Sequence, residues 1–167
     1  RVVFVGPPDS PRYLGKLRAE VDQAGLQPAV VFAGAVPLEE LAQLYGLASA
    51  FVLPSLQENC PQSLLEAMAQ GKAIVASNIA PIRSVLEGVA PLVPPLDHGA
   101  LAQAVLSALR TPEAGPHPTG RARRRAWERH RWPVVAEQTV KVYRGRLSAH
   151  LRPTSPESGP SLVDGRP

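Results

Sequence analysis

The chain has 167 residues, about the size of one domain, with 44% hydrophobic and 19% charged residues. This composition excludes a disordered or collagen-like chain, and no apolar run is long enough for a membrane helix. The net charge of +4 arises after residue 112, where 11 Lys and Arg stand against 5 Asp and Glu. The chain begins at Arg1, directly before an apolar run, so we expect a piece of a longer protein. The single Cys60 excludes an internal disulfide.

Short apolar runs and amphipathic segments alternate over the first 110 residues. In chain order we predict a strand over Val2–Val5, a helix over Tyr13–Ala24, a strand over Ala29–Ala33, a helix over Leu38–Ala48, a strand over Ala50–Leu53, a helix over Leu64–Gln70, strands over Ala73–Ala76 and Pro91–Val93, and helices over Leu101–Leu109 and Val134–Leu147. The alternation predicts an α/β fold in which right-handed βαβ units form a Rossmann-like parallel sheet flanked by helices. Ligands of such sheets bind beyond the carboxyl ends of the strands.

Composition divides the chain into four parts. Residues 1–112 form the predicted α/β domain, which we expect to be truncated at its N-terminus. Residues 113–131 form a connector that is rich in Pro and Gly and then in Arg. Residues 132–150 form a helix expected to pack on the domain. Residues 151–167 are polar and rich in Pro and Ser, so we expect a disordered tail.

Several common site signatures are absent from the sequence. It contains no G-x-G-x-x-G after a strand, no phosphate loop and no nucleophile elbow. The four histidines are scattered without metal-ligand spacing. We therefore expect neither a metal site nor a serine hydrolase.

The informative stretch is the loop and helix after Ala50–Leu53. It places Glu58 in the loop and Glu66 more than one turn inside the helix, with Pro61 in the first helical turn. The helix N-terminus between them is an anion site because its N–H groups are free and the helix dipole is positive there. A phosphate at this N-terminus and hydroxyl-binding carboxylates on either side would suit a sugar nucleotide.

This segment resembles the E-x7-E motif of the family 4 glycosyltransferases, which have the two-domain GT-B fold. The resemblance covers about residues 1–147, because further segments follow the family's order and spacing. These segments are Val31–Val36, Leu41–Ala48, Phe51–Ser55, Leu64–Gly71, Ala73–Ser77, Leu92–Pro94 with Asp97, and Trp132–Tyr143. The resemblance implies the donor-binding half of a bacterial-type, retaining, metal-independent glycosyltransferase of the hexosyltransferase type.

The same resemblance implies roles for individual residues. Glu58 is the catalytic candidate and would contact hydroxyls of the transferred sugar, and Glu66 would accept hydrogen bonds from the ribose. The donor's base would lie against Val36 and Pro37. The remaining candidate donor-binding residues are Asn59, Cys60, Gln62, Ser63 and Leu64, whose amides would meet the diphosphate, and Gly6. No cofactor is implied, and the donor is a UDP-, GDP- or ADP-linked sugar.

Three departures from the family pattern bear on activity. The usually glycine-rich loop is Asn59–Gln62, and Pro61 lacks an amide donor. Ser84 stands where a glutamate is common. The Arg and Lys that neutralise the leaving diphosphate in the family, and the acceptor domain, lie outside this chain. We therefore expect the fragment alone to be inactive.

Three alternatives remain open at this stage. One is a non-catalytic nucleotide-sugar-binding module, and another is a sugar-nucleotide epimerase of the same architecture. The third is a module that adheres to lipid or nucleic acid through Arg121–Arg131. We expect no nucleic acid partner, an acceptor that is lipid-linked or a small molecule, and weak association of Arg121–Arg131 with a membrane surface. The expected location is the cytoplasm, peripherally at the inner face of the membrane.

Overall fold

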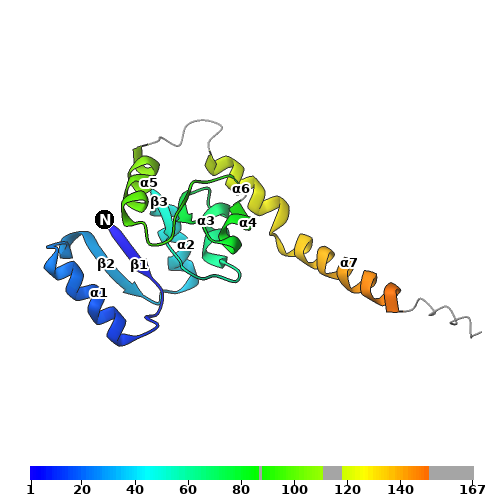
Figure 1. The fold of residues 1–167 in the computed structure, drawn as a ribbon, viewed down its shortest axis with the longest axis horizontal. Coiled ribbons are helices and arrows are strands. Elements are labelled where there is room, and N and C mark those ends of the chain that lie inside the picture. Colours follow the sequence, from blue (N-terminus) through cyan, green and yellow to red (C-terminus); the bar gives the residue numbers. More distant parts are fainter. Residues whose placement is uncertain (87, 111–117, 151–167) are drawn as a thin grey trace, which may run out of the picture.

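The computed structural model describes residues 1–86, 88–110 and 118–150. Strands and helices alternate up to residue 110, as the sequence predicts, and two further helices follow (Figure 1). The elements are β1 (Val2–Val5), α1 (Pro11–Gln23), a 3-10 turn (Gln27–Ala29), β2 (Val30–Gly34), α2 (Leu38–Leu47), β3 (Ala50–Leu53), α3 (Gln62–Ala69), β4 (Ala73–Ser77), α4 (Ala80–Leu86), β5 (Leu92–Val93), α5 (His98–Arg110), α6 (Pro118–Arg129) and α7 (Trp132–His150). The expected α/β class with parallel strands is confirmed.

The strands form two parallel sheets rather than one. The first has the order β1-β2 and the second the order β3-β4-β5. Val3 pairs with Val31 in the first sheet, and Phe51 pairs with Ile74 in the second. In the described part of the chain no ladder joins β1 to β3, so the single sheet expected from the alternation is divided between these two strands.

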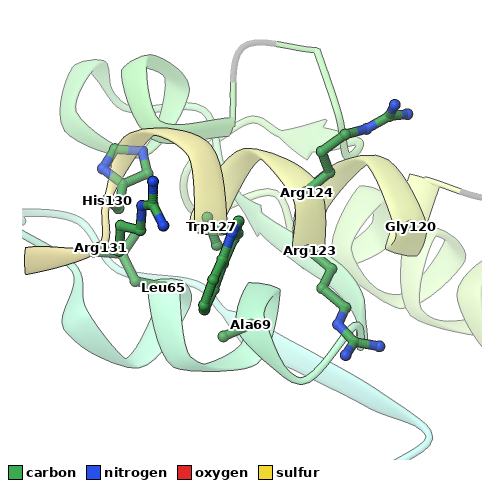
Figure 2. Close-up of a pocket in the computed structure, with 9 residues that line it drawn as sticks. Leu65, Ala69, Gly120, Arg123, Arg124, Trp127, His130 and Arg131 are labelled. Carbon is green, nitrogen blue, oxygen red and sulfur yellow. The ribbon is translucent and has the colours of Figure 1, made fainter. Parts of the chain in front are cut away.

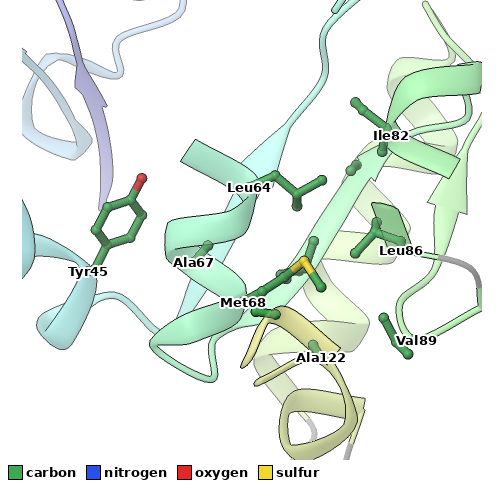
Figure 3. Packing of buried hydrophobic residues seen from close by; sticks show 11 residues of the cluster. Tyr45, Leu64, Ala67, Met68, Ile82, Leu86, Val89 and Ala122 are labelled. Atoms are coloured by element: carbon green, nitrogen blue, oxygen red, sulfur yellow. The ribbon is translucent and has the colours of Figure 1, made fainter. Parts of the chain in front are cut away.

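The core surrounds α3 and β4. Leu64, Ala67 and Met68 follow helical spacing on α3 and are fully buried. They pack with Ile82 and Leu86 of α4 in one cluster, which Figure 3 shows around the methionine side chain. Because α3 is fixed by this burial, its N-terminal turn has a defined position at the carboxyl end of β3.

The helix α6 corrects the expectation that residues 113–131 form a connector. Ala122 and Ala126 lie one turn apart on α6 and are buried in the core, against α3. Small side chains at this spacing let the two helices approach closely. Composition did not predict this packing, because α6 is rich in arginine and these two alanines are its buried residues in the described structure.

The helix α7 is also different from its prediction. It begins at Trp132, extends away from the sheets in Figure 1 and contacts α6. Trp132, Val142 and Tyr143 are exposed by 64% or more. In the described structure, therefore, α7 does not pack on the α/β domain, contrary to the prediction. The predicted tail over residues 151–167 lies outside the described residues, as do residues 111–117, which include the start of the predicted connector at 113.

Candidate functional site

The loop from β3 to α3 carries most of the candidate residues. The helix begins at Gln62, and Pro61 is its N-cap rather than part of its first turn. Asn59, Cys60 and Gln62 are exposed to solvent. The N–H groups at the start of a helix have no acceptor within it, so those of Gln62 and Ser63 are available as hydrogen-bond donors.

Leu64 is placed differently from its prediction as a donor-binding residue. Its side chain is fully buried in the core, and its N–H donates to the carbonyl of Pro61 at 3.1 Å. The N–H of Leu65 also donates to this carbonyl, at 3.2 Å. Fewer N–H groups at the start of α3 are therefore free to bind an anion than the sequence predicts.

Glu66 lies on the second turn of α3, half-buried, and is held by a hydroxyl from another helix. The Tyr45 hydroxyl, from α2, donates to Glu66 Oε2 at 2.9 Å and lies 3.2 Å from the carbonyl oxygen of Ser63. Tyr45 is 9% exposed. Burial, followed by the hydrogen bond and the negative charge of Glu66, raises the pKa of Tyr45 well above its usual value. The phenol therefore keeps its proton and fixes one carboxylate oxygen of Glu66.

Glu58 has its own hydroxyl partner within the loop. Ser55 donates through Oγ to Glu58 Oε1 at 2.8 Å, and both residues are half-buried. Only two residues separate the pair, so the contact also stabilises the loop that carries Glu58. Along the chain the two glutamates thus lie before and after the first turn of α3, each with a hydroxyl partner.

The remaining predicted residues lie at the carboxyl ends of β1 and β2. The N–H of Gly6 donates to the carbonyl of Gly34 at 2.8 Å, and both glycines have positive φ, 132° and 69°. Such angles are strained for other residues, which explains glycine at both strand ends. Val36 is half-buried, and Pro37 is the exposed N-cap of α2.

The helix α2 connects the loop of Val36 and Pro37 to Glu66. It begins after Pro37 and carries Tyr45 near its end. Lys72, just before β4, donates through Nζ to the carbonyl of Gly46 at 2.8 Å, and the Tyr45 ring packs on Phe51 of β3 with centroids 5.9 Å apart. The end of α2 is therefore held by both α3 and the second sheet.

A cavity of about 690 Å³ lies between α3 and α6 and includes neither glutamate (Figure 2). Its lining combines Leu65 and Ala69 with the indole of Trp127 and several basic side chains. His130 Nε2 is buried here without a hydrogen-bond partner in the described structure. Burial first, and then the charges of Arg125 and Arg129, lower the pKa of His130.

Two further observations concern predicted features. In the described segments no group of three His, Cys, Asp or Glu side chains could hold a metal ion. Ser84, where the resembled pattern commonly has glutamate, is exposed and donates to the carbonyl of Pro81 at 2.8 Å.

Tyr45 was not predicted as a site residue, because it lies within the apolar pattern of the predicted helix Leu38–Ala48. A buried tyrosine hydroxyl usually has a hydrogen-bond partner. A tyrosine on the buried face of α2 therefore indicated that some polar group lies next to it. The identity of its acceptor, 21 residues away, has no local signature.

Comparison with known proteins places these features in context. The family described as "Glycosyl transferases group 1" matches residues 1–111. The alpha-maltose-1-phosphate synthase of Mycolicibacterium smegmatis is 30% identical over 153 residues, which are 86% of this chain and 40% of that protein. The sucrose-phosphate synthase of Thermosynechococcus elongatus has a TM-score of 0.77 at 29% identity, over 88% of this chain and 38% of its own.

The fold also matches that of HepE (Alr3699) from Anabaena, solved with UDP and glucose. Its TM-score is 0.78 at 20% identity, over 86% of this chain and 40% of its own. The chain thus spans about two fifths of the length of these proteins.

Proposed function

Because the chain belongs to the group 1 glycosyl transferases, we propose that it is the donor-binding half of a retaining, metal-independent glycosyltransferase. The enzyme would transfer a sugar from a nucleotide sugar to an acceptor hydroxyl. The observation that carries the proposal is the pair of half-buried glutamates beside the first turn of α3, each oriented by a hydroxyl. The complex of HepE with UDP and glucose supports a nucleotide-sugar donor.

The geometry suggests how the donor would be held. Tyr45 occupies Oε2 of Glu66, so Oε1 would accept hydrogen bonds from the ribose hydroxyls. The diphosphate would meet the free N–H groups at the start of α3, where the helix dipole also favours negative charge. The base would lie against Val36 and Pro37.

Glu58 would act at the sugar itself. Its carboxylate would accept hydrogen bonds from hydroxyls of the transferred sugar and stabilise positive charge that develops near the anomeric carbon. The acceptor oxygen would form its bond to that carbon as the bond to the nucleoside diphosphate breaks, and the hydroxyl proton would pass to the departing phosphate oxygen. Ser55 would keep the carboxylate in position through the loop.

Calorimetric titration tests the donor site. UDP, GDP and ADP, each alone and as a sugar conjugate, are titrated into this chain and into the longer polypeptide that contains it. We expect one nucleotide to bind tightest and Glu66→Ala to weaken it at least tenfold, whereas Glu40→Ala, an exposed carboxylate in the first turn of α2, leaves it unchanged. Equal affinities for the wild type and Glu66→Ala in the longer polypeptide would contradict the proposal.

Product analysis tests the reaction. We expect the longer polypeptide to form a glycoside with the donor's anomeric configuration, seen by NMR, at a rate that EDTA does not change. Conversion of the sugar nucleotide without an acceptor would favour the epimerase alternative. Binding without any turnover would favour the non-catalytic module.

The basic helix α6 supports a second proposal, weak association with an anionic membrane surface. The side chains of Arg121, Arg123 and Arg124 are exposed, and the exposed Trp127 stands under the guanidinium of Arg131, 5.2 Å from the ring centroid. Arginine and tryptophan together suit the interface of an anionic bilayer. No helix in the described segments is long and apolar enough to cross a bilayer.

Vesicle sedimentation tests this association. We expect the protein to sediment with vesicles containing phosphatidylglycerol but not with pure phosphatidylcholine vesicles. Replacing Arg123 and Arg124 by Gln should reduce the fraction of protein bound to the vesicles. Replacing Arg12 and Lys16 of α1 by Gln should leave this fraction unchanged. Binding that is independent of lipid charge would refute the proposal. The cytoplasmic location, and an acceptor that is lipid-linked or a small molecule, stay predictions.

A further inference from the structure

The cavity between α3 and α6 has the size and lining of a ligand pocket, and the proposed donor site does not use it. Its volume is about 690 Å³, within the range of about 300–1,000 Å³ that is typical of small-molecule pockets. Leu65 and Ala69 of α3 and the indole of Trp127 form apolar walls (Figure 2). Both helices therefore offer apolar surface to a ligand.

The charged part of the lining is basic. Three arginines line the cavity, Arg123, Arg124 and Arg131, and no carboxylate does so in the described part of the chain. Figure 2 shows Arg131 on one side of the Trp127 indole and Arg123 on the other, whereas Arg124 points away. The Cδ of Arg123 lies 3.7 Å from the position of a Cβ built on Gly71, so its stem packs on the end of α3. Two guanidinium groups are therefore held beside the apolar walls, where their charge favours an anionic ligand.

His130 contributes a polar atom that lacks a partner. Its Nε2 atom is buried and has no hydrogen-bond partner within the described residues, although buried polar atoms in native proteins nearly always have one. Burial, followed by the charges of two neighbouring arginines, lowers the pKa of His130, so the ring is uncharged at neutral pH. A neutral imidazole can donate a hydrogen bond. Because His130 and Arg131 lie on the same side of the indole, an anionic oxygen beside Arg131 would satisfy this atom.

We propose that this cavity binds one molecule of an anionic amphiphile. Its phosphate or carboxylate group would pair with the guanidinium of Arg131 and accept a hydrogen bond from His130 Nε2. Its apolar body would cover Leu65, Ala69 and the indole of Trp127. Such a molecule could come from solution or from a bilayer. The site goes beyond the proposed association of α6 with a membrane surface and does not rest on it, because that association needs only exposed positive charge.

Tryptophan fluorescence tests the site directly. The chain has two tryptophans, and Trp132→Phe, at an 80% exposed position, leaves Trp127 as the only one. We expect octyl phosphate, titrated below the concentration at which it forms micelles, to shift the emission of Trp127 to shorter wavelength and to saturate at one molecule per chain. Inorganic phosphate and 1-octanol each carry only one part of the ligand and should bind at least tenfold more weakly. No saturable shift with octyl phosphate, or equal binding of inorganic phosphate, would overturn the proposal.

Two substitutions in the same background separate the apolar walls from the charge. Ala69→Phe fills the cavity from an exposed position on α3 and should weaken the binding of octyl phosphate at least tenfold. Ala102→Phe, at an exposed position on α5, is the matched control and should leave binding unchanged. Arg131→Gln should weaken binding about tenfold through loss of a charge-assisted hydrogen bond, whereas Arg12→Gln of α1 should not. Unchanged affinity in an Ala69→Phe variant with the Tm of its control would refute the site.

Vesicles distinguish the two sources of the ligand. A shift in Trp127 emission with phosphatidylglycerol vesicles, which Ala69→Phe abolishes while the protein still sediments with them, would identify bilayer lipid as a source. A shift with octyl phosphate alone would identify a soluble amphiphile. Sedimentation with vesicles but no shift with either ligand would support the membrane association alone and refute the cavity site.

Discussion

Removing the hydroxyl that holds Glu66 should have a measurable cost in stability. Tyr45→Phe deletes the donor 2.9 Å from Glu66 Oε2 and leaves the ring packed on Phe51. Hydrogen bonds to charged groups contribute about 1.5–3 kcal/mol. Glu66 is half-buried, so water partly replaces the lost donor, and we expect a decrease of about 1–2 kcal/mol in the free energy of unfolding. This corresponds to a decrease of about 3–6 °C in Tm.

Urea unfolding at pH 7 measures this difference, with Tyr13→Phe as the matched control because Tyr13 is 60% exposed. The control should change the free energy of unfolding by less than about 0.5 kcal/mol. If Tyr45→Phe matches the control, the hydroxyl does not anchor the carboxylate and the reasoning is refuted.

The pH dependence gives the same contact a second readout. The pKa of Tyr45 is raised in the folded protein, so the unfolded chain loses its proton first, at about pH 10. Stability from this group is therefore complete below pH 10 and decreases as the pH rises further. The decrease between pH 9 and 11 should be smaller in Tyr45→Phe than in the wild type. Equal decreases would contradict the contact.

Three further substitutions test the packing and charge described above. Met68→Ala, at a fully buried position, should lower the free energy of unfolding by about 2–5 kcal/mol in urea titration, whereas Leu47→Ala, at an 83% exposed position, should cost less than 1 kcal/mol. Gly71→Ala should cost about 1 kcal/mol in the same assay, because φ is +65° there while the added Cβ would lie 3.7 Å from Arg123 Cδ, an ordinary contact. The lowered pKa of His130 means that the unfolded chain gains a proton first, so stability decreases as the pH falls through about 6.5. His130→Asn should make the decrease in Tm between pH 7.5 and 5.5 shallower, and an unchanged decrease would exclude His130 as its source.

Local patterns predicted most elements because each has its own signal. The strand Ala50–Leu53 has the predicted bounds, since a proline ends it. The helix α2 begins at Leu38 as predicted, whereas the other four predicted helices begin two or three residues earlier than predicted. Caps lie outside the apolar period: Ser10 caps α1, which begins at Pro11 rather than Tyr13. Helix α4 was missed because it has only seven residues and contains Pro81.

Other features depend on contacts between distant segments and were not predictable in this way. Two alanines among arginines decide that α6 packs on α3. The strand order, and with it the division between β1 and β3, has no local signature. Both glutamates were identified as candidates from the sequence, and the structure adds the hydroxyl partner of each.

The attachment of α2 has a consequence for how specificity could evolve in the proposed enzyme. One rigid helix joins the loop proposed to contact the base, at Val36 and Pro37, to the hydroxyl that orients Glu66. Lys72 holds the end of this helix at Gly46. Side-chain changes at the loop could therefore alter the choice of base while the ribose contact is inherited unchanged. Insertions within α2 would rotate Tyr45 away from Glu66 and disturb both contacts, so this helix should tolerate substitution but resist changes in length.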